Sequence, residues 1–385
     1  MKVLVAHNRY RSNLPSGENT VVDDDIAALR AEGVEVLPLM EESDKIPCLG
    51  PAAKLGVASG PVYNPDGVRR MRTMLAVHQP DVVHIHNVFP LLSPWVVRAA
   101  HNADVPVVQT VHNFRRDCVA GTFFRDGGIC TDCSGRRWAT PAIRYGCYRG
   151  SRMQTLPMVI GRAIHESTWR SIDRFLVLTA FHAEYLATLG VPEDRIVVRP
   201  TSVPDPGDID PPGNDVLFVG RLDAEKGVAL LLDAWERRPR DSRRLVIAGD
   251  GPLAEFVRTR AHRNPSITYV GRLAPHEVEA AMKSAAVVAL PSVWLEGLPR
   301  VAVEAMARGR ALIVVGHGGL ASVVDSACGW VLPPDVPAWA AALGDLDDSE
   351  LGRRGVGARS RFEARFERSI TTALLLRAYG EVTAA

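Results

Sequence analysis

The chain has 385 residues, enough for two domains of ordinary size that each have a hydrophobic core. Hydrophobic residues make up 46% of the chain and charged residues 23%, which is typical of a soluble globular protein. The formal net charge is +1, so charge alone gives no reason to expect a nucleic-acid partner. The first residues lack the pattern of a signal peptide, and no apolar run approaches the roughly 20 residues of a membrane helix, so we expect a cytoplasmic protein.

The first half of the chain alternates short apolar segments with helical ones. A polar loop around Ser16 and Gly17 separates the first strand from a helix over about 20–31. Strands are predicted at 2–7, 35–39, 82–86, 107–111 and 174–178. Continuous apolar strands that alternate with helices indicate a parallel sheet covered on both faces.

The same alternation begins again after residues 204–214, which hold four prolines and two glycines and read as a linker. Strands are then predicted at 215–219, 244–248, 267–270, 286–290 and 311–315, with helices between them. The chain therefore reads as two doubly wound α/β domains. Because ligands bind at the carboxyl ends of such strands, we expect the active site in a cleft shared by the two domains.

Two acids, Glu296 and Glu304, flank the start of a predicted helix that Pro299 opens and Gly309 ends. Glu296 falls in the loop before the helix, and Glu304 lies about one turn inside it. The open N–H groups of a helix start favour a bound anion. Acids do not bind phosphate, so we expect these two to hold hydroxyl groups beside it, such as a ribose and a sugar on either side of a diphosphate.

Two cations, Arg221 and Lys226, follow Gly220 at the end of a predicted strand. Arg can bind two phosphate oxygens and Lys adds a point charge, so the pair suits a diphosphate. The alternative is a solvated loop with an ion pair to Glu225.

Two further strand ends carry glycine turns, at residues 248–252 and 270–273. Gly249 would allow close approach of a ligand, and Arg272 and Leu273 are expected to contact it too. Tight turns need glycine in any case, so a purely structural role is the alternative.

His112 ends the strand at 107–111, and we expect it to offer a hydrogen bond to the donor sugar, unless it is a satisfied structural histidine. His84 and His86 end another strand and share one face of it. A metal pair is conceivable there, but a polar rim of the cleft is the favoured interpretation.

Four cysteines lie within one 30-residue stretch, with two of them in a Cys-x2-Cys pair: Cys118, Cys130, Cys133 and Cys147. This spacing suits a structural, tetrahedral Zn²⁺ that would organise a polar, glycine-rich loop. The alternative is four unrelated thiols.

Residues 136–174 hold eight arginines and two acids, with aromatic residues between them. Such a segment could form a surface for an anionic acceptor or a membrane, although a solvated helical face is the default interpretation. The run 23–25 of three aspartates lies inside a predicted helix, where the side chains diverge, so we do not expect it to bind a metal.

Taken together, these residues resemble the family 4 retaining glycosyltransferases (glycosyl transferases group 1), in the subset with a four-cysteine insertion. The motif at 220–227, Gly-Arg-Leu-x-x-Glu-Lys-Gly, the Ala-Gly-Asp-Gly-Pro turn and the Glu-x7-Glu pattern follow one another in the family's order. The resemblance implies a GT-B fold, with two Rossmann-like domains facing across a cleft. The expected parts are an acceptor-side domain at 1–203 with an insertion at 114–150, a nucleotide-sugar domain at 204–365, and a helix at 366–385 that returns to the first domain.

The resemblance also implies roles for single residues. Arg221 and Lys226 would bind the donor diphosphate, Glu304 the ribose and Glu296 the transferred sugar. The amides of Gly297 and Leu298 would support the phosphate. The full donor-site set would be Gly17, Gly220, Arg221, Lys226, Gly249, Arg272, Leu273, Glu296, Gly297, Leu298 and Glu304, with His112, Glu296, Arg221 and Lys226 as the catalytic residues.

The implied reaction moves a sugar from a UDP- or GDP-sugar to a hydroxyl acceptor (a glycan, lipid-linked or natural-product intermediate), with retention by front-face attack. No carboxylate nucleophile is evident near His112, and no catalytic divalent metal is expected because Arg221 and Lys226 replace it. Peripheral contact with the cytoplasmic face of a membrane is a further expectation. The alternatives are a nucleotide-sugar epimerase of the same architecture and a protein that senses nucleotide sugars, against which the retained charges speak. The segment 199–203 and the single glycine at Gly17 depart from the family pattern, which weakens inference about the acceptor.

Overall fold

The computed structural model describes residues 1–12, 16–207, 209, 211–239 and 242–384. The chain divides into two compact units. The first comprises Met1–Phe123, Cys130–Arg199 and Thr372–Ala385, and the second comprises Phe124–Ile129 and Pro200–Thr371. No described helix is long and apolar enough to cross a membrane.

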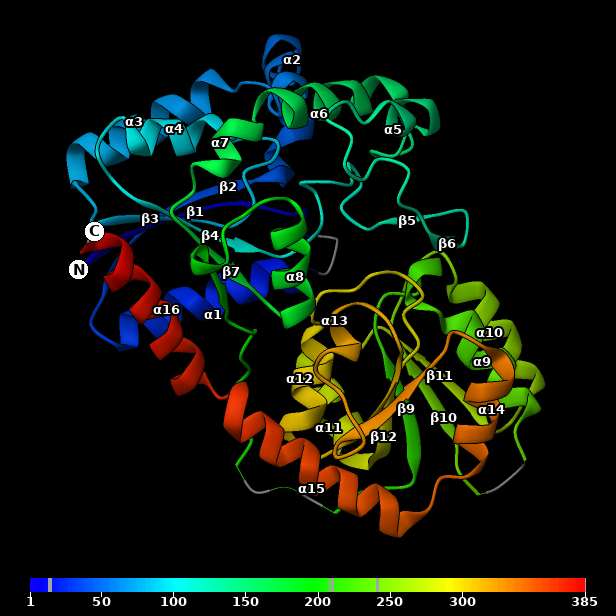
Figure 1. Cartoon of the computed structure of the whole chain (residues 1–385). Helices are drawn as coiled ribbons and strands as arrows, with labels where there is room; N and C mark the ends of the chain where they lie inside the picture. Colours follow the sequence, from blue (N-terminus) through cyan, green and yellow to red (C-terminus); the bar gives the residue numbers. More distant parts are fainter. Residues whose placement is uncertain (13–15, 208, 210, 240–241, 385) are drawn as a thin grey trace. The chain divides into compact units, whose positions relative to one another are not determined.

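Six parallel strands form the sheet of the first unit, in the order β2-β1-β3-β4-β7-β8 (Figure 1). The strands are β1 Lys2–Arg9, β2 Glu35–Glu42, β3 Val82–Ile85, β4 Val107–Val111, β7 Arg174–Val177 and β8 Ile196–Val198. The five strands predicted for this half are confirmed within three residues at their ends, because each is a continuous apolar run that the sheet buries.

Helices cover both faces of this sheet. They are α1 Gly17–Ala31, α2 Pro51–Ser59, α3 Pro65–His78, α4 Trp95–His101, α5 Thr140–Tyr145, α6 Arg152–Ile164, α7 Glu166–Arg170, α8 Ala180–Thr188 and α16 Arg368–Thr383. α1 begins three residues earlier than predicted, because the Ser16 hydroxyl accepts a hydrogen bond from the Asn19 N–H at 3.3 Å and caps the helix.

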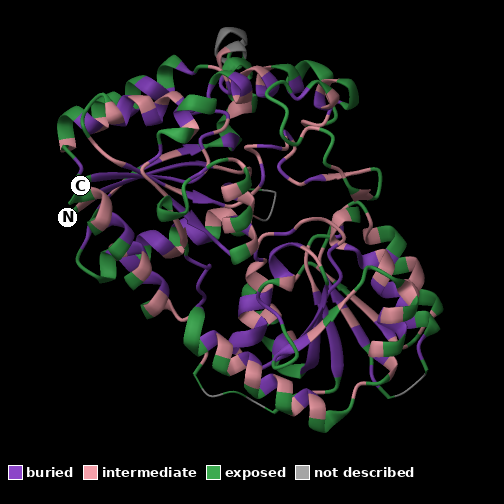
Figure 2. Ribbon diagram, viewed as in Figure 1, coloured by how far each residue is buried: buried purple, intermediate pink, exposed green. Residues whose placement is uncertain are grey.

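Two apolar clusters show how the faces are covered (Figure 2). On one face, residues such as Met71 of α3, Val97 of α4 and Leu186 of α8 pack on the strands. On the other, Leu29 of α1 and Leu375 of α16 pack on them. The last helix of the chain is therefore part of the core of the first unit.

The second unit has its own six-stranded parallel sheet, in the order β11-β10-β9-β12-β13-β14. Its strands are β9 Asp215–Val219, β10 Leu245–Ala248, β11 Ile267–Gly271, β12 Ala285–Leu290, β13 Ala311–Val315 and β14 Gly329–Leu332. Its helices are α9 Val228–Arg237, α10 Ala254–Arg263, α11 Pro275–Ser284, α12 Arg300–Ala307, α13 Gly318–Ala321, α14 Val336–Gly344 and α15 Asp348–Arg365. A short hairpin joins β5 Phe124–Arg125 to β6 Gly128–Ile129.

Each sheet reverses its strand order at one point, between β1 and β3 in the first unit and between β9 and β12 in the second. At such a switch point the loops after the two strands run in opposite directions and leave a crevice, where ligands bind in doubly wound folds. The residues that follow β1, β3, β9 and β12 are therefore the first place to look for a site.

A buried ion pair joins α1 to Arg199, the residue directly after β8. Both guanidinium nitrogens of Arg199 donate to the Asp25 carboxylate, at 2.8 and 2.6 Å, and the exposed fractions of the two residues are 1% and 3%. Burial and the Asp25 carboxylate raise the pKa of the neighbouring Tyr379, whose hydroxyl lies 2.7 Å from His84 Nδ1. α1, β3, α16 and the segment after β8 thus meet in one polar network inside the core.

We expect the Asp25→Ala variant to lose about 3–5 kcal/mol of unfolding free energy, because it removes the carboxylate that compensates the buried Arg199. The double variant Asp25→Leu/Arg199→Met removes both charges and should cost clearly less. Urea unfolding of the three proteins, followed by circular dichroism, measures the difference. Equal losses in the single and double variants would contradict this account of the pair.

Candidate functional site

The loops at the carboxyl edge of the second sheet are packed backbone to backbone. A side chain at Gly227 (φ +70°) would place its Cβ 1.9 Å from the Pro291 carbonyl oxygen, and one at Gly249 (φ +150°) would lie 1.8 Å from the Gly220 carbonyl oxygen. Only glycine fits at either position. The Val293 N–H donates to the Glu225 carbonyl at 2.9 Å. The loops after β9, β10 and β12 are thus held in one fixed arrangement at the switch point.

Both predicted cations of this edge pair with acids. The Arg221 guanidinium lies 2.5 Å from Asp223 and 3.2 Å from Glu225, so the alternative of an ion pair to Glu225 is present in this structure. The ammonium group of Lys226 forms an ion pair with Glu296, from the loop after β12. The structure thus brings Lys226 and Glu296 together from positions 70 residues apart.

Glu296 is 6% exposed, and its position is set from two sides. The Ser292 hydroxyl donates to its carboxylate, and its carbonyl oxygen accepts a hydrogen bond from the Gly319 N–H at 2.7 Å. His317 Nε2 lies 3.1 Å from the Ser292 carbonyl oxygen, which ties the loop after β13 to the same place. Sequence reasoning missed Ser292 and His317. The signal that could have revealed His317 is the Gly-His-Gly-Gly run directly after a predicted strand.

Two helices begin at this switch point, α9 after Gly227 and α12 after Pro299. The first N–H groups of a helix have no partner within the helix and favour an anion. Glu304, on α12, forms an ion pair with Arg300 at 2.8 Å. The predicted placement of Glu296 before a helix and Glu304 inside it is confirmed.

The remaining predicted donor residues lie in the neighbouring loops of the same edge. Gly249 accepts a hydrogen bond from the Tyr269 hydroxyl at 3.2 Å, and its N–H donates to the Gly271 carbonyl at 2.7 Å. Arg272 follows β11 and is exposed, with Leu273 half-buried beside it in the chain. Gly297 lies so close to Gly319 that a Cβ on the latter would meet its carbonyl oxygen at 1.7 Å.

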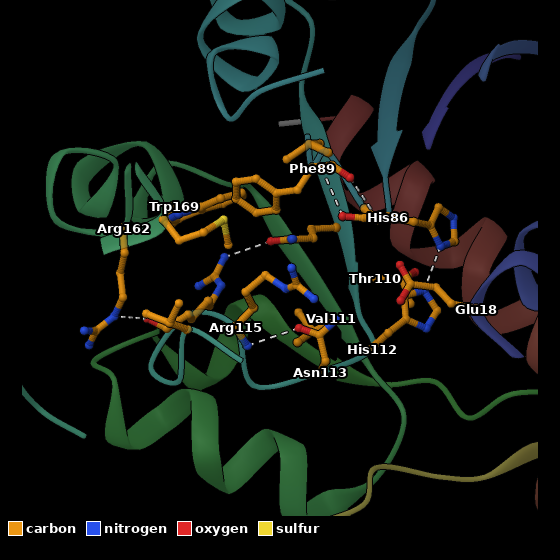
Figure 3. A pocket seen from close by; sticks show the side chains of 16 residues that line it. Glu18, His86, Phe89, Thr110, Val111, His112, Asn113, Arg115, Arg162 and Trp169 are labelled. Carbon is orange, nitrogen blue, oxygen red and sulfur yellow. Dashed lines mark hydrogen bonds between the residues drawn. The ribbon is translucent and has the colours of Figure 1, made fainter. Parts of the chain in front are cut away.

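In the first unit a pocket opens at the carboxyl ends of β3 and β4 (Figure 3). His112 lines it, with its Nε2 2.9 Å from Nδ1 of His86. His84 is wholly buried and lies between Tyr379 and the Thr110 hydroxyl, 2.8 Å from its Nε2. His84 and His86 therefore bond to protein groups. The expectation of a polar rim is wrong for His84, which lies in the core, while His86 lines the pocket of the first unit.

Burial keeps several histidines of the first unit neutral. Burial lowers the pKa of His7 to about 4, of His84 to about 3 and of His182 to about 4. Burial, followed by the charges of neighbouring histidines, lowers the pKa of His86 and of His112 well below the usual value. At neutral pH His112 is therefore a hydrogen-bonding group without charge.

One acid of the pocket was not expected. Glu18, in the first turn of α1, lines the same pocket as His112, although the sequence had indicated no carboxylate nucleophile near that histidine. Burial raises the pKa of Glu18 to about 7, and the Tyr10 hydroxyl lies 3.3 Å from its carboxylate. Gly17 precedes it as the first residue of α1, exposed and with open space around its Cα.

The four cysteines do not form the zinc site that their spacing predicted. No group of three or more His, Cys, Asp or Glu side chains that could hold a metal is found among the described residues, all four cysteines included. Cys133 and Cys147 pack against an apolar cluster that contains Met158, and burial raises the pKa of the Cys133 thiol. The spacing alone could not reveal this packing.

A buried aspartate organises the loop for which the sequence predicted a zinc ion. The Asp117 carboxylate accepts hydrogen bonds from the Ser134 hydroxyl and from the Gly135 N–H at 3.1 Å. It also pairs with Arg162 of α6 at 2.8 Å. Asp117 thereby ties the insertion to α6, to which the Arg116 carbonyl and the Tyr148 N–H are also hydrogen-bonded. Of the aspartate run, Asp23 pairs with Arg9 and Asp25 with Arg199.

We expect the unfolding free energy to fall as the pH drops below about 6.5, because the unfolded chain then protonates histidines that the folded protein keeps neutral. Each such histidine contributes about 1.4 kcal/mol per pH unit. Glu18 has the opposite sign: its raised pKa stabilises the fold at low pH, and this contribution is lost as the pH rises through about 7. Urea unfolding at several pH values between about 7 and 5 measures the slope.

The His182→Gln variant removes one buried histidine and should reduce that slope by about 1.4 kcal/mol per pH unit. His276→Gln, at an exposed position of α11, is the matched control and should leave the slope unchanged. A slope that is the same in all three proteins would show that burial does not hold His182 neutral.

Comparison with known proteins agrees with this architecture. Residues 16–201 match the family model of a glycosyl transferase 4-like domain, and residues 213–348 match that of glycosyl transferases group 1. The chain is 26% identical over 300 residues to an uncharacterised glycosyltransferase of Methanocaldococcus jannaschii, which covers 69% of this chain and 66% of that protein. It is 27% identical over 343 residues to the phosphatidyl-myo-inositol mannosyltransferase of Mycobacterium tuberculosis, which covers 83% of this chain and 79% of that one.

Among solved structures, the chain is similar to Anabaena HepE in complex with UDP and glucose. The TM-score is 0.68 with 15% identity, and the match covers 99% of this chain and 100% of that one. Likeness at this identity shows the fold, which is the GT-B fold expected from the sequence. The matching models and both relatives are transferases, and they give no support to the epimerase alternative. The chain is therefore a glycosyltransferase, with a glycosyl transferase 4-like domain followed by a glycosyl transferases group 1 domain.

Proposed function

We propose that this enzyme transfers a sugar from a nucleoside-diphosphate sugar to a hydroxyl acceptor, with the donor diphosphate bound at the switch point of the second sheet. The observation that carries the proposal is the meeting of Lys226 with Glu296 beside the starts of α9 and α12. A cation and two sets of open helix N–H groups converge there, which suits a diphosphate. The UDP bound to HepE supports the same class of donor.

The ion pairs of the site show which groups Lys226 and Arg221 bind when no donor is present. Lys226 has three N–H donors, so its ammonium group can keep Glu296 while it binds phosphate oxygens. Glu296 then stands next to the diphosphate, at the place where the transferred sugar is attached. Arg221 has an exposed side chain, and we propose that it exchanges Asp223 or Glu225 for the phosphate.

The other roles follow the resemblance. We propose that Glu304 binds the ribose, that the amides of Gly297 and Leu298 support the phosphate, and that His112 offers the sugar a hydrogen bond. Cations and helix amides would stabilise the charge that develops on the leaving nucleoside diphosphate. The proposed outcome is retention by front-face attack, with no catalytic divalent metal.

We expect Lys226→Ala and Glu304→Ala to weaken the binding of UDP or GDP, whichever the wild-type protein binds, by about 10- to 100-fold. A hydrogen bond to a charged group contributes about 1.5–3 kcal/mol, and 1.4 kcal/mol corresponds to tenfold in affinity. Titration calorimetry measures the affinities. Lys283→Ala on α11 and Glu255→Ala on α10 are matched controls in the same unit, where the same changes should leave affinity as it is. Unchanged affinity in Lys226→Ala would overturn the proposed donor site.

We further expect the slow hydrolysis of a bound donor sugar, without any acceptor, to release a sugar that keeps the donor's anomeric configuration. Proton NMR at early times, before the free sugar mutarotates, reads that configuration, and Lys226→Ala serves as the inactive control. Release of the opposite anomer would contradict retention. A sugar epimerised while still attached to its nucleotide would restore the epimerase alternative.

A further inference from the structure

The outer face of α6 in the first unit is apolar. Its inner face packs in the core through residues such as Thr155, Met158 and Val159. On the opposite side Met153, Leu156 and Ile164 are 86%, 46% and 40% exposed, and they recur at helical spacing with the half-buried Ile160. A surface helix normally turns polar residues outward, so an exposed second apolar stripe is unusual, and packing among the described residues leaves Met153 largely uncovered.

The orientation of α6 is fixed, so the stripe cannot turn inward. Arg162, on the inner side, forms its ion pair with the buried Asp117, and its Nε donates to the Arg116 carbonyl at 2.7 Å. Gly161 lies against Pro61, where a Cβ would meet the Pro61 carbonyl oxygen at 2.2 Å. These contacts hold the helix from within and leave Met153 and Leu156 in solvent.

The segment that holds the stripe is rich in arginine, and the nearest acids in the chain are Asp132 and Glu166 at its two ends. Residues 133–165 hold six arginines and no aspartate or glutamate. All but the inward Arg162 are exposed: Arg136, Arg137, Arg144, Arg149 and Arg152. Arg136 and Arg144 line one surface hollow together with Asp132, and Arg152 Nε donates to the Arg144 carbonyl at 3.0 Å. α5 and α6 lie side by side in this part of the first unit (Figure 1).

Exposed aromatic side chains complete this surface. Trp138 precedes α5 and Tyr145 ends it, and they are 51% and 46% exposed. Trp and Tyr have an apolar ring with a polar group, so they favour the boundary between water and the acyl chains of a bilayer. Arginines above anionic headgroups, aromatic rings at the boundary and an apolar stripe below it form the pattern of an interfacial helix.

We infer that α5, α6 and the loop at 136–138 form a docking surface for an anionic lipid bilayer, with Met153 and Leu156 inserted among the acyl chains. A nucleic acid or another polyanion would use the arginines but not the apolar stripe. In a symmetric dimer through this surface, the five exposed arginines of one copy would face the same five of the other, and their repulsion disfavours such a dimer. The inference rests on this surface and not on the donor site. It adds to the proposed function that acceptor and enzyme can meet at a lipid surface.

Flotation of the full-length protein with vesicles tests the inference. The wild type should float with phosphatidylglycerol vesicles, remain unbound with phosphatidylcholine vesicles, and lose binding as salt rises. The Arg136→Glu/Arg137→Glu variant should bind at least about 25-fold more weakly, since each arginine near an anionic membrane contributes about 1 kcal/mol, or roughly fivefold. Arg72→Glu, exposed on α3, is the charge control and should behave as the wild type does.

The Met153→Gln/Leu156→Gln variant, which removes the apolar side chains without adding charge, separates a bilayer from other partners. It should lose vesicle binding while its retention on a heparin column stays as in the wild type, and Val77→Gln, at a position 67% exposed on α3, should lose neither. The inference is overturned if the wild-type protein does not bind phosphatidylglycerol vesicles, or if the Met153→Gln/Leu156→Gln variant binds them equally well. A wild-type dimer that this variant turns into a monomer would overturn it too. UDP and GDP calorimetry on the same variants reports on the donor site separately, so failure of one proposal is distinguishable from failure of the other.

Discussion

The ion pair between Lys226 and Glu296 lies where the strand order of the second sheet reverses, and the rest of the site is arranged around it. Gly227 lets the start of α9 approach the loop after β12, and Gly319 lets the loop after β13 approach Glu296 from the other side. A Cβ at Gly227 would lie 1.9 Å from the Pro291 carbonyl oxygen, and one at Gly319 would lie 1.7 Å from the Gly297 carbonyl oxygen, so a side chain at either position would force these loops apart. Close backbone packing therefore holds the charged groups in place before any ligand arrives.

The first unit holds several ionisable groups in the interior of a sheet domain, and their contacts keep these groups neutral. Arg199 and Asp25 neutralise each other in the core, and His84 lies between Tyr379 and Thr110. His86 in turn fixes the ring of His112 through a hydrogen bond. An uncharged imidazole presented in this way can contact a sugar hydroxyl without attracting the donor phosphates. The last helix of the chain takes part, because Tyr379 belongs to α16.

The sequence was most informative where a residue type determines the local structure of the backbone. Continuous apolar strands predicted both sheets, and Pro299 and Gly309 marked the two ends of α12 closely. Arg221, Lys226, Glu296 and Glu304 could be placed at one sheet edge because each follows a predicted strand. What could not be predicted are contacts between side chains from distant segments. Ser292 carries no local signal of its link to Glu296, and the Gly-His-Gly-Gly run marks His317 as a strand-end residue without naming its partner. Nothing near Glu18 in the sequence indicates that it shares a pocket with His112.

The cysteines show the limit of spacing as a guide. Cys-x2-Cys with two flanking cysteines fits a zinc ribbon, yet the insertion is organised by the carboxylate of Asp117, while Cys133 and Cys147 pack as apolar groups. A single aspartate in a polar loop gives no sign of that role. The exposed stripe of α6 is the opposite case, since the arginines of this segment were singled out in the sequence and its apolar residues were not, and the structure shows that α6 has two apolar sides.

The proposed function depends most directly on where the nucleotide binds. A crystal structure of the protein soaked with UDP and, separately, with GDP is the most direct measurement. The account predicts a diphosphate in hydrogen-bond contact with the Lys226 ammonium group and with the first N–H groups of α12, and Glu304 on the ribose. A nucleotide bound elsewhere in the second unit, with Lys226 still paired to Glu296 alone, would contradict it.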